Sequence, residues 1–268
     1  MGLPVVLTVA GSDSGGGAGI QADIKTFHAL GVHGTCAVTS VTSQNTLGVQ
    51  GRFDLPPSLV LSQMEAVFSD MEVAAVKTGM LANAEVVRAV AEELRRRGAR
   101  NLVVDPVVMS SSGYRLLEED GVVALVQSLL PLARVFTPNL AEASLLLGSE
   151  VRDLEGMREA ARRLAELGPA CVVLKGGHLG GGRAVDLFYD GERLLELEAE
   201  RVDTTDDHGT GCVFSAAVAA YLALGEGPRE AVRRAKGFVT EALRGSLRLG
   251  RGRGPVNPPP TPEGCLGA

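Results

Sequence analysis

The chain has 268 residues and a formal net charge of −6, with 45% hydrophobic and 4% aromatic residues. This composition suits one large α/β domain and argues against a nucleic-acid partner, whose surface needs basic residues interleaved with aromatic rings. No run of 18 apolar residues occurs, and Val5-Val6-Leu7 comes without a basic leader, so we expect a cytoplasmic protein without a membrane partner. The four cysteines and four histidines lack metal-ligand spacing, which argues against a zinc site.

Short apolar runs alternate with amphipathic segments, as expected for crossover βα units on a parallel sheet. Nearly continuous apolar character indicates strands buried on both faces. The predicted strands are Val5–Ala10, Thr35–Thr39, Val73–Lys77, Leu102–Asp105 and Val172–Lys175. A further apolar segment, Ala133–Phe136, runs into the polar residues Thr137–Glu142. Apolar residues three and four positions apart predict helices at Ile20–Leu30, Ser58–Phe68, Ala84–Arg97, Asp120–Leu130, Ala141–Leu147 and Leu154–Leu167.

The pattern changes after residue 183. Ala184–Tyr189 and Arg193–Glu198 flank Asp190-Gly191, which predicts an antiparallel edge hairpin with a type I′ turn. Two helices are expected next, at about 210–224 and 228–247. The last 19 residues hold five glycines and five prolines, so we expect one domain over 1–249 and a flexible tail over 250–268.

The segment His208-Gly209-Thr210-Gly211-Cys212 precedes an apolar run that is typical of a buried helix. Two glycines allow a tight turn whose N–H groups face a ligand at the helix N-terminus, so the segment predicts an anion-binding site. The helix dipole is expected to lower the pKa of Cys212, a candidate base or nucleophile, and the nearby acids Asp206 and Asp207 to oppose this. The alternative is a glycine-rich helix start with a buried cysteine.

Lysine is rare, since 22 of the 26 basic residues are arginine. Lys77 and Lys175 each end an apolar strand. Ligands bind beyond the carboxyl ends of parallel strands, so both side chains are candidates to face a cleft and bind phosphate. The alternative is a lysine whose stem packs while its ammonium reaches solvent. Lys25 and Lys236 lie in predicted helices, where a solvated face is expected.

Asp105 directly follows a strand, and Glu142 stands in an Asn-x-x-Glu step. Both carboxylates could hold Mg²⁺ directly or through water. The alternatives are a cap or turn acceptor for Asp105 and a first-turn dipole partner for Glu142. The chain has no Gly-Lys dipeptide and therefore no P-loop, and its Gly17-Ala18-Gly19-Ile20-Gln21-Ala22 segment lacks the acidic ribose partner of a dinucleotide site. Together these features indicate phosphoryl transfer by positioning and charge neutralisation.

Six segments in order resemble the hydroxymethylpyrimidine/phosphomethylpyrimidine kinases of thiamine biosynthesis, in the ribokinase-like superfamily. The resemblance spans about residues 4–256, and the segments that carry it are Ala10–Asp23, Ser43–Thr46, Lys77–Leu81, Val104–Val107, Thr137–Glu142 and His208–Cys212. It implies a three-layer α/β sandwich with a mostly parallel sheet. It also implies phosphorylation of 4-amino-5-hydroxymethyl-2-methylpyrimidine by ATP and Mg²⁺, first to the monophosphate and then to the pyrophosphate.

The resemblance also implies roles for individual residues. In this resemblance, Cys212 stands at the position where related sugar kinases carry a catalytic Asp. The residues implied near ATP and Mg²⁺ are Asn139, Glu142 and Lys175. Those implied around the pyrimidine are Gly11, Asp23, Gln44 and Met80. The Gln44 amide offers an acceptor beside a donor, which matches an amino group beside a ring nitrogen, although a loop glutamine could equally cap backbone.

The sequence departs from the family pattern at three positions, with Asp207 and Val213 where threonine is common and Arg253 where histidine is frequent. An acid at 207 would oppose a thiolate unless it faces solvent or a cation. A pyridoxal kinase and a non-catalytic pyrimidine-binding protein are the alternatives, and a homodimer is left open.

Overall fold

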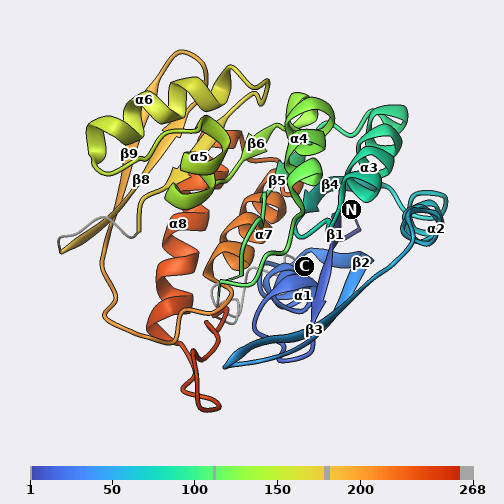
Figure 1. The fold of residues 1–268 in the computed structure, drawn as a ribbon, viewed down its shortest axis with the longest axis horizontal. Helices are drawn as coiled ribbons and strands as arrows, with labels where there is room; N and C mark the ends of the chain where they lie inside the picture. Colours follow the sequence, from blue (N-terminus) through green and yellow to red (C-terminus); the bar gives the residue numbers. More distant parts are fainter. Residues whose placement is uncertain (1, 111–112, 178–181, 260–268) are drawn as a thin grey trace.

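The computed structural model describes residues 2–110, 113–177 and 182–259. These residues form a central nine-stranded sheet of order β3-β2-β1-β4-β5-β6-β7-β8-β9 (Figure 1). The neighbouring strands from β2 through β1, β4, β5 and β6 to β7 pair in parallel. The outer pairs β2–β3, β7–β8 and β8–β9 are antiparallel. The strands are β1 (Val5–Asp13), β2 (His33–Asn45), β3 (Gly48–Asp54), β4 (Val73–Thr78), β5 (Leu102–Val104), β6 (Val135–Phe136), β7 (Val172–Lys175), β8 (Arg183–Tyr189) and β9 (Leu194–Glu200).

Helices cover both faces of the sheet (Figure 1). One face packs against α1 (Gly19–Ala29), α7 (Thr210–Ala223) and α8 (Pro228–Arg244). The other packs against α2 (Pro57–Phe68), α3 (Ala84–Arg97), α4 (Glu119–Ala124), α5 (Leu140–Leu147) and α6 (Leu154–Ala165). Successive strand residues enter opposite cores, as Val6 and Leu7 do, because strand side chains alternate between faces. The predicted three-layer α/β fold is confirmed.

The edges of the sheet differ from the prediction. Strand β2 runs well beyond Thr39, and β3, which the sequence analysis misses, pairs with its end. In the hairpin, Tyr189 pairs with Leu194, so the loop has four residues. Gly191 has a φ of +91° but Asp190 does not have a positive φ, so the predicted type I′ turn is wrong. Instead, the Asp190 carboxylate accepts hydrogen bonds from two later backbone amides and closes the loop.

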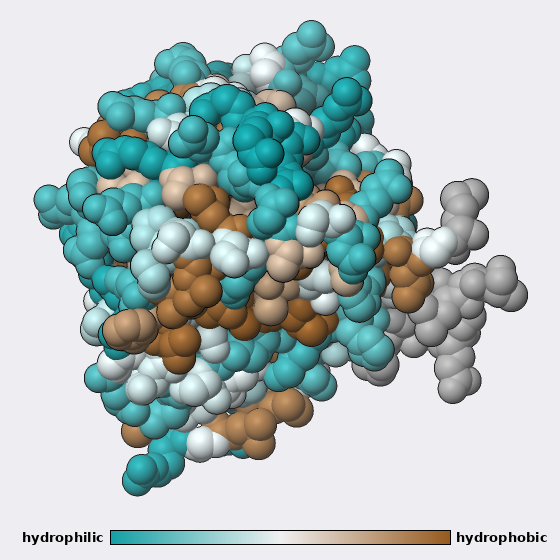
Figure 2. Space-filling model, turned by 90° about the vertical axis from the view of Figure 1, so that its right-hand side faces the viewer, coloured by the Kyte–Doolittle hydropathy of each residue, from teal (hydrophilic) through white to brown (hydrophobic). Residues whose placement is uncertain are grey.

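Apolar side chains gather on the side of the molecule where α2 and α3 lie (Figure 2). Val41 of β2 and Phe53 of β3 are cross-strand partners, 49% and 68% exposed. Such exposed apolar pairs are common at protein contacts, and the homodimer stays a prediction. No helix in the described ranges is long and apolar enough to span a membrane.

Candidate active site

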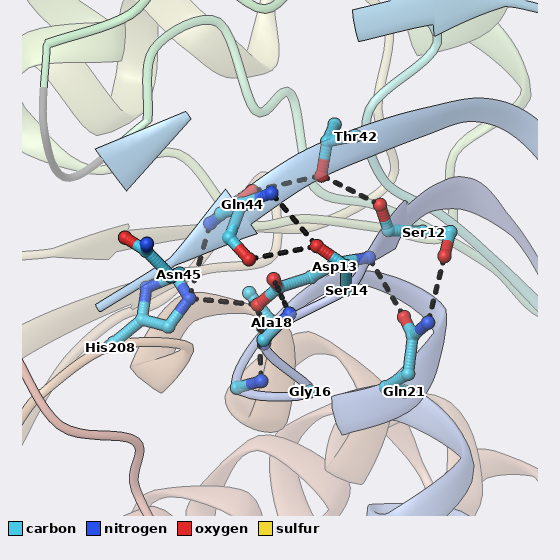
Figure 3. Close-up of polar contacts among 12 residues, drawn as sticks. Ser12, Asp13, Ser14, Gly16, Ala18, Gln21, Thr42, Gln44, Asn45 and His208 are labelled. Atoms are coloured by element: carbon cyan, nitrogen blue, oxygen red, sulfur yellow. Dashed lines mark hydrogen bonds and ion pairs between the residues drawn. The ribbon is translucent and has the colours of Figure 1, made fainter. Parts of the chain in front are cut away.

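The loop after β1 is organised around the carboxylate of Asp13, the last residue of that strand (Figure 3). This carboxylate accepts hydrogen bonds from the backbone amides of Gly15 at 2.8 Å, Gly17 at 3.1 Å and Ala18 at 2.8 Å. Burial alone would raise the pKa of Asp13, but the hydrogen bonds from His208 and from the Gly15 and Ala18 amides lower it. Asp13 is therefore an ionised residue that fixes the glycine-rich loop.

His208 joins this loop to the end of β2. Its Nε2 atom lies 2.9 Å from Asp13 Oδ2 and 3.3 Å from Gln44 Nε2 (Figure 3). Its backbone pairs with Gly254 and Val256 near the C-terminus. The structure thus brings the predicted pyrimidine residue Gln44 against a histidine to which the sequence analysis gave no role.

The other residues expected around the pyrimidine lie at different depths. A side chain at Gly11 would come within 2.9 Å of Met80 Sδ, so these two predicted residues are neighbours. Asp23 is fully buried and accepts from Thr8 at 2.6 Å and from Lys77 at 2.8 and 3.0 Å. Burial opposes the charge on both groups and raises the pKa of Asp23, while Asp23 in turn raises the pKa of Lys77, and the two lie at ion-pair distance. The expectation that Lys77 faces the cleft is wrong, because its ammonium is fully buried on Asp23.

The glycine-rich turn before α7 adopts a conformation that requires glycine. Gly209 has a φ of +87°, and a side chain there would overlap the carbonyl of Gly17. The Thr210 amide and hydroxyl both donate to the Asp207 carbonyl. Helix geometry gives the Gly211 and Cys212 amides no carbonyl partner within the helix. The predicted anion-binding site therefore narrows to these two N–H groups.

The prediction of a lowered pKa for Cys212 is wrong. Burial raises the pKa of this thiol to about 11; Lys77 acts in the opposite direction, and the carboxylates of Asp23 and Asp105 raise it further. Desolvation outweighs the helix dipole because a thiolate loses most of its solvation inside the protein. Cys212 is accordingly a neutral thiol at neutral pH.

A second cluster of polar side chains, at the ends of β5 and β7, lies beside the same turn. Lys175 Nζ lies 3.2 Å from Asp105 Oδ1, and Ser215 Oγ donates to Asp105 Oδ2 at 3.0 Å. A side chain at Gly211 would lie 3.4 Å from Lys175 Nζ, so the ammonium stands beside the turn. Burial opposes charge on Lys175, but Asp105 and then Glu142 raise its pKa. The strand-end lysine is therefore a cation held next to the amides of the predicted anion-binding site.

Glu142 and Asn139 form a capping box at the start of α5. Asn139 Oδ1 accepts from the Glu142 amide at 2.9 Å, and Glu142 Oε2 accepts from the Asn139 amide at 2.9 Å. Glu142 Oε1 also faces the Val108 amide at 3.4 Å, and burial raises the pKa of the carboxyl group. The helix-cap alternative is thus real, and it leaves Glu142 beside Lys175 without presenting a bare carboxylate.

These oxygens allow a test of the expected metal. Within the part of the chain that the structure describes, no group of three or more His, Cys, Asp or Glu residues could hold a metal ion. Asp105 and Glu142 each already accept protein hydrogen bonds. This donor set fits Mg²⁺ bound through its waters together with nucleotide phosphates, since this ion usually keeps several waters.

Two of the departures from the family pattern bind each other. The Arg253 guanidinium donates to both carboxylate oxygens of Asp207, at 2.8 and 2.5 Å. The extra acid therefore faces a cation. The neighbouring Asp206 carboxylate accepts from the Gly254 amide, and Val256 is 5% exposed. The structure thus packs residues 252–257 against the site where a flexible tail was expected; residues 260–268 lie outside the described ranges.

A cleft of about 340 Å³ opens beside Gln44 and His208 and is also lined by residues 45–48, Gly252 and Arg253. Lys175 and Asp105 do not line it, so this cleft does not include the polar residues at the ends of β5 and β7. A second cavity of about 560 Å³ lies around residues 73–76 and 96–101, at the amino ends of β4 and β5. Ligands of such sheets bind at the opposite ends of the strands, so we place the site at the first cleft.

Sequence analysis missed the roles of Asp13, His208 and Ser215. The first two belong to segments that carry the family resemblance, but they contact each other across 195 residues. Ser215 follows Gly211 by one helical turn, and that spacing could have indicated a hydroxyl on the same helix face.

The chain is similar to known kinases over nearly all of its length. The family model described as phosphomethylpyrimidine kinase matches residues 13–257. The chain is 51% identical over 256 residues to a hydroxymethylpyrimidine/phosphomethylpyrimidine kinase of Rhizobium meliloti, covering 94% of this chain and 96% of that protein. It is 50% identical over 252 residues to the thiamine biosynthesis bifunctional protein ThiED of Geobacter sulfurreducens, covering 94% of this chain but 51% of that protein, about half its length.

Solved structures with the same fold include two kinds of kinase. The pyridoxal kinase of Staphylococcus aureus in complex with AMP-PCP and pyridoxal superposes with a TM-score of 0.89 at 36% identity, covering 96% of this chain and 94% of that one. The phosphomethylpyrimidine kinase of Clostridium difficile gives 0.79 at 40% identity, covering 90% and 99%.

Proposed function

We propose that this chain, which belongs to the phosphomethylpyrimidine kinase family, transfers phosphoryl groups from ATP to 4-amino-5-hydroxymethyl-2-methylpyrimidine. The first transfer yields the monophosphate, and a second transfer in the same site yields the pyrophosphate for thiamine biosynthesis. The non-catalytic alternative is set aside, because the relatives that cover this chain at about 50% identity are named as kinases.

One observation supports the proposal most strongly: the turn before α7 adjoins both clusters of polar side chains in the site. At its start, His208 contacts Asp13 and Gln44. Three residues later, Gly211 adjoins Lys175 and Asp105. An alcohol near Gln44 and a phosphate near Lys175 would thus meet at the Gly211 and Cys212 amides, as in-line transfer requires.

On the nucleotide side, Lys175 would neutralise the phosphates, and the Gly211 and Cys212 amides would stabilise charge on the moving phosphoryl group. The capping box uses the side-chain oxygen Oδ1 of Asn139, so the side-chain NH₂ of Asn139 is the group that could contact the nucleotide. Asp105 and Glu142 would hold waters of Mg²⁺, which supplies charge neutralisation when bound.

On the alcohol side, Gln44 would bind the pyrimidine edge, and Gly11 and Met80 would line its ring. Asp23, which the family resemblance implies near the pyrimidine, is buried in an ion pair with Lys77. Cys212 as a neutral thiol suits orienting the hydroxymethyl group better than removing its proton in the ground state. In a dissociative phosphoryl transfer the attacking hydroxyl becomes acidic only late in the reaction, so a residue that orients the hydroxyl is sufficient and no base is needed beforehand.

A pyridoxal kinase is the second candidate, because pyridoxal kinases superpose on the chain with TM-scores near 0.89. Their identities of 36 to 39% lie below the 51% shared with the Rhizobium kinase. The Gln44 amide also fits an amino group beside a ring nitrogen, an edge that pyridoxal lacks.

The test is a coupled assay of ADP release by the full chain, with the pyrimidine alcohol, its monophosphate, or pyridoxal as acceptor. We expect ADP release with both pyrimidines, products one and two phosphates heavier by mass spectrometry, and greatly reduced rates in Lys175→Ala. Turnover of pyridoxal with none of the pyrimidine alcohol would reject the proposal.

A further inference from the structure

The Gln44 side chain has two polar neighbours besides any ligand. Its Nε2 atom lies 3.3 Å from His208 Nε2, and its Oε1 atom lies 3.2 Å from Thr42 Oγ1 (Figure 3). The Thr42 hydroxyl also donates to the Ser12 carbonyl at 2.8 Å. A hydroxyl has one proton, so at the shorter contact with Ser12 it cannot also donate to Gln44 Oε1.

Asp13 determines which His208 nitrogen carries a proton. The Asp13 carboxylate already accepts three backbone N–H groups, and its Oδ2 lies 2.9 Å from His208 Nε2. An unprotonated Nε2 would direct its lone pair at an anionic oxygen. His208 Nε2 therefore carries hydrogen and donates it.

With these protons placed, the two Gln44 contacts join like groups: an NH₂ against an N–H, and a carbonyl oxygen against a hydroxyl oxygen whose proton points elsewhere. A half-turn of the amide about its last torsion removes both conflicts. Gln44 Oε1 then shares the His208 N–H with Asp13, and Gln44 Nε2 donates to Thr42 Oγ1.

We infer that the Asp13–His208 pair and Thr42 fix the orientation of the Gln44 amide, and that His208 is thereby a specificity-determining residue. This inference rests on the proposed function and adds the direction in which the substrate is bound. The oriented amide presents its acceptor on the His208 side and its donor on the Thr42 side. A bound aminopyrimidine places its amino group near His208 and its ring nitrogen near Thr42.

The orientation predicts rejection of one analogue. The 4-oxo pyrimidine alcohol presents a carbonyl acceptor and a ring N–H donor in place of the amino group and ring nitrogen. Binding it through Gln44 requires the opposite amide orientation, which restores both conflicts with His208 and Thr42. The ratio of kcat/KM for the 4-amino alcohol over the 4-oxo alcohol therefore reports the orientation.

The test compares this ratio in the parent chain, His208→Leu and Thr42→Val, with His33→Leu as the matched control. His33 is an exposed residue at the other end of β2. We expect the ratio to fall by roughly tenfold in each site variant, the size of one hydrogen bond, and to stay unchanged in the control. The KM for ATP stays near the parent value. A merely structural role would lower activity on both alcohols and leave their ratio constant.

The outcomes separate the two claims. Turnover of the 4-amino alcohol by the parent, with an unchanged ratio in both site variants, overturns the orientation while the proposed function stands. Absence of that turnover in the parent overturns the proposed function and this inference with it. If His208→Leu fails to fold, Thr42→Val decides, because valine matches threonine in shape and removes the acceptor of Gln44 Nε2.

Discussion

The titration of Cys212 is a sharp test of the site chemistry. In a variant with Cys36, Cys171 and Cys265 replaced by serine, Cys212 is the remaining thiol of the sequence. Its pKa of about 11 lies about two units above the ordinary value of 9.0. Each unit is a factor of ten in thiolate, so near neutral pH the thiolate fraction falls by about a hundredfold.

The assay measures the rate of iodoacetamide modification of Cys212 by mass spectrometry from neutral pH to about pH 10, with the same chain in denaturant as control. We expect the native rate to be about a hundredfold below the control near neutral pH and still rising at pH 10, where an ordinary thiol levels off. ATP with the pyrimidine should slow modification further. A native rate that levels off at or below pH 9 would refute the argument from burial.

Three further variants test other parts of the structure. Gln44→Leu should weaken pyrimidine binding by roughly 1 to 3 kcal/mol, seen as a higher KM for the pyrimidine alcohol, and should leave the KM for ATP unchanged. The control Gln50→Leu, at an exposed position, should match the parent. Lys175→Ala should raise the KM for ATP and slow transfer, and Lys175→Arg should rescue it in part; full activity of the alanine variant would make Lys175 merely structural. Lys236→Met removes the cation that lies 2.7 Å from buried Asp186 and should cost about 3 to 5 kcal/mol of unfolding free energy in urea, partly recovered when Asp186→Asn is added; a single variant as stable as the parent would contradict the pairing.

Local patterns predicted most of the fold. Apolar runs such as Val172–Lys175 and helix periodicity such as Ala84–Arg97 are set by neighbours along the chain, and both elements are confirmed with the predicted bounds. Strand β3 was missed because an edge strand with few apolar residues has a weak signal. Lys236, expected on a solvated helix face, is 8% exposed, since periodicity cannot show that a carboxylate from β8 faces it.

The chemistry of the site depended more on partners distant in sequence. Asp23 and Lys77 were both identified as candidates, yet their ion pair joins residues 54 positions apart and buries both side chains. The raised pKa of Cys212 has the same origin, because the helix dipole follows from sequence whereas the depth of the thiol follows from packing. Sequence identified residue types suited to the chemistry, and the fold decided which of them remain accessible.

The departures at Asp207 and Arg253 show how such distant pairs preserve a site. Alone, an acid next to the turn would repel the phosphates that we propose the Gly211 and Cys212 amides bind. The bidentate guanidinium neutralises it from 46 positions away, and the same C-terminal segment pairs with the backbone of His208. Arg253 thus compensates charge while its segment holds His208 against Asp13. Loss of that segment should therefore disturb substrate discrimination as well as phosphate binding.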